Sequence, residues 1–146
     1  MTTTMTKAER ESFLSGTHIG VLSVAGAAGR PPMAVPIWYG YAAGGELTFA
    51  TSPDSVKMAL IREAGQIGFT VQQEAVPYKY VSLEGTVTGY EPTDAEEYRR
   101  WSIRYLGQEA GERFFDGIKN FVGSMVTVRV RPERWRTYDF GKEVIG

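Results

Sequence analysis

Apolar and polar residues alternate with a period of two through most of this sequence, and this pattern constrains the fold more than any other. The longest alternating segment spans residues 80–90, where Val81, Leu83 and Val87 share one face with two glycines. A period of two is typical of a half-buried β-strand. Further segments of this kind occupy residues 18–24, 33–41, 46–51, 67–73, 124–131 and 134–140.

Short turns separate most of these segments. Residues 27–30 and 42–45 are rich in glycine and alanine and predict hairpins. Pro36 predicts an edge strand or a bulge, and Pro132 predicts a break between the last two strands. A capping box at Thr6 and Glu9 predicts a first helix, and helical spacing predicts two more after residues 94 and 108. We therefore expect one domain over residues 1–146, mainly β with some α, built as an antiparallel barrel of six or seven strands with peripheral helices.

Composition excludes several classes of function. The chain has no cysteine and one histidine, which excludes disulfides, thiolate nucleophiles, iron–sulfur clusters and multi-histidine sites, so no metal is expected. Its 16 basic and 17 acidic residues nearly balance, which argues against nucleic acid or an anionic membrane as the main partner. The polar N-terminus has no apolar run of signal-peptide length, and we expect a cytoplasmic protein.

Residues 46–65 are interpreted as a strand that leads directly into a helix. Ser52 suits the N-cap, Pro53 suits the first helical position, and Gly65 ends the helix. The unpaired N–H groups of a first helical turn, with nearby hydroxyls and a lysine, form a set of donors suited to a phosphate. The side chains in this set are Thr51, Ser52, Ser55 and Lys57.

An ordinary capped helix is the alternative interpretation of the same stretch. In that case Lys57 points into solvent and binds nothing. Asp54 favours this alternative, because a carboxylate in the first turn already satisfies the helix dipole.

No group of side chains suggests catalysis by the protein alone. His18 has no nucleophile or orienting carboxylate near it in sequence, and a lone histidine at the start of a strand is more often structural. The glycines form neither a dinucleotide fingerprint nor a P-loop. Catalytic residues therefore stay unassigned, and an enzyme of this composition would depend on a bound cofactor.

Four motifs follow one another in a recognisable order. They are VPIWY at residues 35–39, TSPDSVK at 51–57, PYKYV at 77–81 and the Glu84-Gly85 step. In this order and spacing, residues 10–140 resemble the split β-barrel flavin and deazaflavin oxidoreductases, which are relatives of pyridoxamine 5'-phosphate oxidase. The resemblance implies an FMN-binding split barrel, a homodimer with a cofactor site at each subunit interface, and either FMN or coenzyme F(420) in each site.

The resemblance also implies which residues bind the cofactor. Thr51, Ser52, Ser55 and Lys57 would hold the phosphate. Pro36, Ile37 and Trp38 would lie along the ring system. Tyr78 and Lys79 would reach the site from the partner subunit.

Charge favours coenzyme F(420) over FMN. The FMN phosphate carries nearly two negative charges, whereas the phosphodiester of F(420) carries one. Many relatives have arginine at or beside the position of Val56, and one lysine at a helix N-terminus suits the singly charged group. The glutamate tail of F(420) would need cationic side chains at the rim of the site. The alternative interpretation is that these side chains lie on a solvated strand face and bind no cofactor. The candidates are Arg129, Arg131, Arg134 and Arg136.

The leading hypothesis is an F(420)-dependent reductase that transfers hydride between the coenzyme and a small, electron-poor, planar organic substrate. Tyr78 or water would supply the proton. Two alternatives stay open: an FMN-dependent enzyme like pyridoxamine phosphate oxidase, and a non-catalytic flavin- or deazaflavin-binding protein. The aromatic residues that favour a planar substrate, or else belong to the core, are Trp38, Tyr39, Tyr78, Tyr80 and Trp101.

Overall fold

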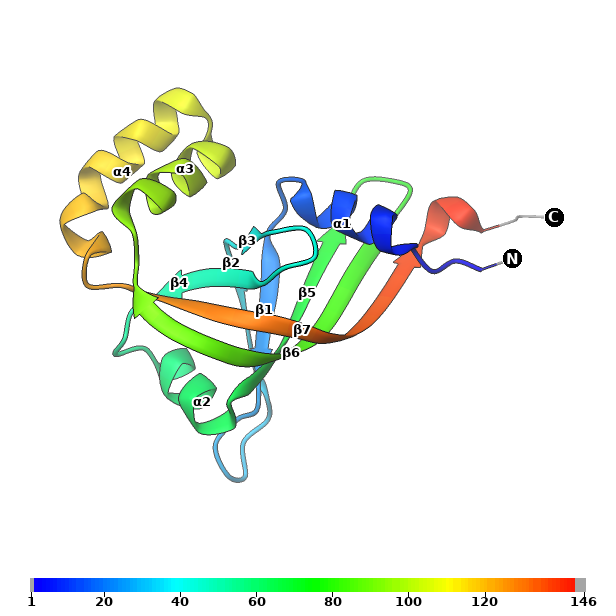
Figure 1. Cartoon of the computed structure of the whole chain (residues 1–146), viewed down its shortest axis with the longest axis horizontal. Coiled ribbons are helices and arrows are strands. Elements are labelled where there is room, and N and C mark those ends of the chain that lie inside the picture. Colours follow the sequence, from blue (N-terminus) through cyan, green and yellow to red (C-terminus); the bar gives the residue numbers. More distant parts are fainter. Residues whose placement is uncertain (1, 144–146) are drawn as a thin grey trace.

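The computed structural model describes residues 2–143, so residue 1 and residues 144–146 of the predicted domain lie outside it. Within the described residues, seven strands form one antiparallel sheet that is accompanied by four α-helices and a 3-10 turn (Figure 1). The strands are β1 (Gly20–Val24), β2 (Met33–Ile37), β3 (Gly40–Tyr41), β4 (Leu47–Thr51), β5 (Gln66–Gln73), β6 (Lys79–Pro92) and β7 (Val126–Asp139). The helices are α1 (Lys7–Ser15), α2 (Val56–Ala64), α3 (Ala95–Leu106), α4 (Gln108–Val122) and the turn η1 (Phe140–Lys142).

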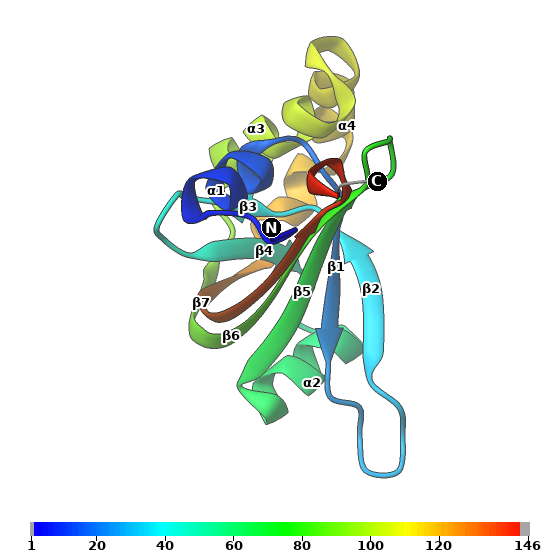
Figure 2. The same ribbon diagram turned by 90° about the vertical axis from the view of Figure 1, so that its right-hand side faces the viewer.

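The order of the strands requires the sheet to curl. That order is β2-β1-β5-β6-β7-β4-β3, so β2 and β3 are its two ends, yet only Trp38 and Tyr39 separate them in the chain. Three Cα–Cα steps reach roughly 11 Å at most, so the two ends of the sheet have to lie close together. The curled sheet is visible in Figure 2. An opening remains because β3 pairs only with Leu47 and Thr48 of β4. The fold is the predicted antiparallel split β-barrel with peripheral helices.

The core fills the inside of this curled sheet. Inward-facing side chains come from five strands, and Leu22, Phe49, Phe69, Leu83 and Val128 are each at most 2% exposed. Their burial confirms the inward faces that the alternation predicted. Burying one such side chain contributes about 1.5–3 kcal/mol, so the barrel interior is the main source of stability.

The segment 33–41 is broken, although the alternation predicted one strand. β2 ends at Ile37 and β3 begins at Gly40. Between them, Tyr39 is fully buried, and its hydroxyl donates to the carbonyl of Leu14 at 2.8 Å. Because of this break, the chain pairs with β1 before it, as β2, and with β4 after it, as β3, on the other side of the opening. Pro36 lies on an end strand, as predicted.

Pro132 does not break the last strand, which corrects the sequence prediction. β7 runs continuously through it and pairs with β6 along its whole length. Pro132 lies opposite Gly85, where the register shifts between Glu84 and Gly85. The register skips Glu133, so the strand accommodates Pro132 at a bulge, where proline is tolerated.

Helices α1 and α3 begin close to the predicted positions. Thr6 and Glu9 form the predicted capping box of α1, and Asp94 caps α3. Helices α3 and α4 pack against each other and extend from the barrel at the ends of β6 and β7 (Figure 1). No helix between residues 2 and 143 has the length and hydropathy needed to cross a membrane.

Candidate functional site

The start of α2 lies three residues later than the sequence predicted. Ser55, and not Ser52, is the N-cap, and its hydroxyl accepts the N–H of Met58 at 3.2 Å. Residues 52–55 form a turn instead, in which the N–H and the hydroxyl of Ser55 both donate to the carbonyl of Ser52. Lys57 is therefore the second residue of the helix.

This shift changes the balance between the two interpretations of the junction. Asp54 now precedes the helix, and the first turn contains no acidic residue. Asp54 therefore lies just before the N-cap and not in the first turn, where the alternative interpretation placed it. The ion pairs formed among residues 2–143 do not include Lys57. The first turn keeps its unpaired N–H groups, and Val56 beside them is 66% exposed.

The predicted hydroxyl donors differ in access. Ser52 is exposed, whereas Thr51 is 3% exposed and its hydroxyl lies 3.4 Å from that of Ser55. Because the Ser55 hydroxyl already serves the N-cap, the donors open to an incoming anion are Ser52, Lys57 and the backbone N–H groups. This set can hold one phosphate group at the protein surface.

The three predicted ring-binding residues lie at the end of β2 but point in different directions. Pro36 is exposed, and Ile37 packs against the core. Trp38 lies against the α3–α4 hairpin: its ring stacks on Tyr105 at 4.9 Å and meets the edge of Phe114 at 5.7 Å. One face of the indole is therefore covered by the protein itself.

Topology places these residues and the phosphate donors on the two free edges of the sheet. β2 pairs only with β1, and β4 has no strand beyond Thr48 on the side away from β7. The edge at Pro36 and the edge ending at Thr51 thus border the opening of the split barrel. An elongated ligand with a ring and a phosphate could contact both edges.

Tyr78 and Lys79 lie elsewhere in the same chain. Thr51 pairs with Val126, which pairs with Pro92 at the far end of β6. Lys79 begins β6, thirteen residues before Pro92, which is about 40 Å along the strand. In one chain these residues do not belong to one cofactor site. Their contribution from a partner subunit stays a prediction.

The Tyr78–Lys79 segment has its own local contacts. The Tyr78 carbonyl accepts the N–H of Phe140 at 2.9 Å, and the Lys79 ammonium lies 4.0 Å from Asp139. A pocket of about 430 Å³ lies beside both residues and includes Tyr80 and Gln73. The Tyr78 side chain is 50% exposed, so it is available to another molecule.

Several residues considered from the sequence have structural roles. Tyr39 and Trp101 are buried and cannot contact a substrate. His18 stacks on Phe13 at 4.5 Å, and burial, with a smaller effect from Arg104, lowers its pKa and keeps it neutral.

The strand arginines mostly pair with carboxylates. Arg136 pairs with Glu84 at 2.8 Å, and Arg131 pairs with Glu133 at 3.3 Å. Arg129 donates to Glu91. These pairs favour a solvated strand face over a site for a cofactor tail.

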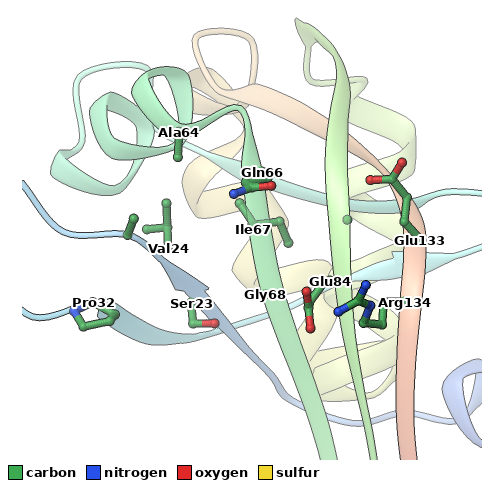
Figure 3. Close-up of a pocket in the computed structure, with 12 residues that line it drawn as sticks. Ser23, Val24, Pro32, Ala64, Gln66, Ile67, Gly68, Glu84, Glu133 and Arg134 are labelled. Atoms are coloured by element: carbon green, nitrogen blue, oxygen red, sulfur yellow. The ribbon is translucent and has the colours of Figure 1, made fainter.

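One pocket on the barrel does not coincide with the predicted site. Figure 3 shows a pocket of about 540 Å³ between β1, β5, β6 and β7. Its wall includes Ser23, Gly68, Glu84, Gly85, Glu133 and Arg134, and none of the nine predicted cofactor residues. Among residues 2–143 no group of three histidines or carboxylates is arranged to hold a metal ion.

Sequence reasoning missed the role of the α3–α4 hairpin. The Tyr105 hydroxyl donates to the carbonyl of His18 at 2.7 Å and accepts the N–H of Tyr39 at 3.2 Å. Arg104 donates to the carbonyls of Gly16 and Tyr39. These bonds fix the hairpin beside Trp38. The helical spacing of its aromatic residues was visible in the sequence, but their partners are more than sixty residues away.

Comparison with known proteins is consistent with this fold. The family model described as pyridoxamine 5'-phosphate oxidase matches residues 6–139. An F(420) reductase structure is 21% identical, with 86% of this chain and 94% of that chain covered and a TM-score of 0.69. A conserved hypothetical protein from Mycobacterium tuberculosis is 22% identical, with 100% and 94% covered and a TM-score of 0.74. An FAD-binding protein from Mesorhizobium loti is 17% identical, with 93% and 96% covered and a TM-score of 0.65. No curated protein matches the sequence.

Proposed function

The chain belongs to the pyridoxamine 5'-phosphate oxidase family, and we propose that it is an oxidoreductase that transfers hydride between coenzyme F(420) and a small, electron-poor, planar organic substrate. The family and fold support a flavin- or deazaflavin-type oxidoreductase. Among the similar structures are one named as an F(420) reductase and one named as an FAD-binding protein. The choice of F(420) is ours and depends on the charge at one helix.

The observation that carries the proposal is the open start of α2. Lys57 is half-buried, and the first turn contains no acidic residue. The sequence resemblance also implies that many relatives have arginine at or beside the position of Val56. One full charge and one half-charge from the helix balance a phosphodiester better than a phosphate monoester. The exposed hydroxyl of Ser52 adds a neutral donor.

The bound coenzyme supplies the redox chemistry, and the protein's residues bind and orient it. The donors at α2 fix the charged end, and Pro36 with the edge of β2 flanks the ring system. Trp38, held by Tyr105, gives this end of the opening a rigid aromatic wall that favours a planar substrate. Tyr78 of a second copy, or water, supplies the proton.

A second copy of the chain completes the site in this proposal. The outer face of the sheet carries an uncharged row across four strands, formed by Pro36, Val21, Thr70 and Ser82. Val21 is 37% exposed, and the nearby Ile19 is 48% exposed. An uncharged sheet face with exposed apolar side chains such as Val21 and Ile19 favours association with a like surface. The homodimer brings Tyr78 and Lys79 of one subunit to the α2 start of the other.

Titration of the purified protein with F(420), followed by quenching of its fluorescence, tests the proposal. Saturable binding is expected, and Lys57→Ala should weaken it by about 1.5–3 kcal/mol because a charge-assisted contact is lost. Lys119→Ala is the matched control, since Lys119 lies on α4 and pairs with Asp116. Equal affinity for F(420) in Lys57→Ala and wild type would show that the phosphate lies elsewhere.

A turnover assay distinguishes an enzyme from a binding protein. The colour of the purified protein distinguishes bound FMN from F(420). Incubation of the protein with reduced F(420) and a panel of quinones and nitro compounds should oxidise the coenzyme. Binding without oxidation of the coenzyme would favour the non-catalytic alternative. A yellow protein as purified, with no affinity for F(420), would favour the FMN enzyme.

The homodimer has an independent test. Val21→Glu places a carboxylate in the uncharged row and should convert the dimer to a monomer in analytical ultracentrifugation. The same variant should bind F(420) more weakly. Asn120→Glu, on an exposed position of α4, should change neither property. A wild-type monomer that binds F(420) would contradict the shared site.

A further inference from the structure

A second pocket lies on the side of the barrel where α1 crosses the β3–β4 turn and β7. Its volume is about 410 Å³, and its wall includes Lys7, Arg10, Tyr41, Gly44, Arg131 and Trp135. It shares no residue with the proposed cofactor site. A volume of this size is sufficient for a small organic ligand.

Arg10 has no acceptor for its buried N–H group. Its guanidinium lies over Trp135, with Cζ 4.0 Å from the ring centroid. Among residues 2–143, the buried Nε atom of Arg10 has no hydrogen-bond partner. Stacking uses the face of a guanidinium and leaves its in-plane donors unused, and those donors match the two oxygens of a carboxylate. A buried donor without a partner is rare enough in proteins to require an explanation.

The pocket also carries uncompensated positive charge. Lys7 lies three residues before Arg10, on the same side of α1. Neither residue forms an ion pair with any other residue from 2 to 143, and Glu11 is the only carboxylate of this wall that is likewise unpaired. Glu46 pairs with Arg129 at 3.8 Å. Two uncommitted cations therefore face one carboxylate.

The rest of the wall is apolar and aromatic. The ring of Tyr41 meets the ring of Trp135 edge-on at 6.4 Å, and Pro132 lies beside them. Gly44 has a positive φ of 71°, and a Cβ placed there would approach nothing closer than Glu11 at 3.9 Å. The pocket thus combines an unpaired guanidinium with a surface for a flat, apolar group.

From these features we infer that the pocket binds a small aromatic carboxylate. The carboxylate would accept from the terminal N–H groups of Arg10, because the Nε atom itself is buried, with Lys7 nearby as a second cation. The ring would lie against Tyr41, Pro132 and Trp135. This site goes beyond the proposed redox function and does not depend on it.

Calorimetric titration of the full chain with sodium benzoate and, separately, with sodium phosphate tests the site. Benzoate should bind saturably and more tightly than phosphate. Arg10→Ala should weaken benzoate binding at least about ten-fold, and Arg10→Lys should weaken it several-fold because the charge stays but the fork is lost. Arg113→Ala is the control, because Arg113 lies on α4 and pairs with Glu109.

A second variant protects the test against loss of folding in Arg10→Ala. Glu11→Gln removes the unpaired carboxylate and should tighten benzoate binding. In NMR spectra of the arginine Nε–H groups, benzoate should shift the Arg10 signal, assigned by its loss in Arg10→Lys. No saturable binding, or unchanged affinity in Arg10→Lys and Glu11→Gln, would overturn the site. Equal affinity for phosphate would overturn the aromatic ligand. No flavin or deazaflavin enters this experiment, so its failure leaves the proposed redox function intact.

Discussion

At two glycines of α4, substitution by alanine is expected to change the stability of the protein in opposite directions. Gly111 faces α3, and a Cβ placed there would lie 2.5 Å from Cα and 2.7 Å from the backbone N of Ile103. These are backbone atoms and cannot move aside as a side chain can. Gly117 lies on the same helix, and a Cβ there would have no atom within 4 Å. The pair therefore separates close packing from helix propensity within one element.

The expected magnitudes follow from these contacts. Alanine in place of glycine in a helix interior gains about 1 kcal/mol from propensity, so Gly117→Ala should stabilise the protein by roughly that amount. At Gly111 the same gain is outweighed by overpacking, which costs about 1–3 kcal/mol or more when backbones collide. Gly111→Ala should therefore destabilise the hairpin, or separate α3 from α4.

Urea unfolding followed by circular dichroism measures both variants against wild type. The free energies of unfolding of the two variants should change in opposite directions. In thermal unfolding, the melting temperature of each variant should shift by about 2–5 °C per kcal/mol. Stabilisation by both substitutions would mean that α3 and α4 do not approach as closely as described. That result would also remove the support for the position of Trp38.

Three further predictions concern single side chains. Tyr105→Phe keeps the ring but leaves the buried N–H of Tyr39 unpaired, which should lower the free energy of unfolding by about 1–3 kcal/mol in urea titrations. Val56→Arg adds a charge at the α2 start and should tighten FMN binding by about 1 kcal/mol, more than F(420) binding, in parallel titrations. A hydrogen bond from Lys142 is the main cause that lowers the pKa of Glu9 from 4.5 to about 2. Because the carboxylate is favoured in the folded state, its contribution is present above pH 4.5 and is lost as the pH falls towards 2. Glu9→Gln should therefore flatten the acid side of the stability profile, measured as the urea midpoint against pH.

Local patterns in the sequence predicted the parts of the fold that local physics determines. The capping box at Thr6 and Glu9 involves residues within one turn, and the structure has it as predicted. Pro36 lacks a donor, which predicted an edge strand or a bulge, and the structure has it on an end strand. Alternation identified the inward faces because only one face of each strand can be buried.

The start of α2 could not be settled by the same rules. Ser52 and Ser55 are both good N-caps, and Pro53 fits a first helical turn or a preceding turn equally well. The choice depends on packing: α2 lies against β1 and β5, with Met58 and Ile61 fully buried. A chain leaving β4 has to reverse direction to reach that position, and residues 52–55 form the reversal. That these residues bind a phosphate stays a prediction, and which of their donors are open to an anion could be read only from the fold.

Tyr78 and Lys79 lie too far from the start of α2 to share a cofactor with it within one chain. These residues lie about 40 Å along β6 from the strand end beside Thr51, so no folding of a single chain with this sheet brings them to the α2 start. If they contact the same cofactor, cofactor binding and dimerisation are thermodynamically linked. Any change that weakens the dimer must then also weaken cofactor binding. The outer sheet face around Val21 and the cation at Lys57 then affect one equilibrium although they share no contact. Val21 lies opposite Pro36, beside the proposed ring position, so loss of F(420) affinity in Val21→Glu supports the shared site only when the dimer is lost with it.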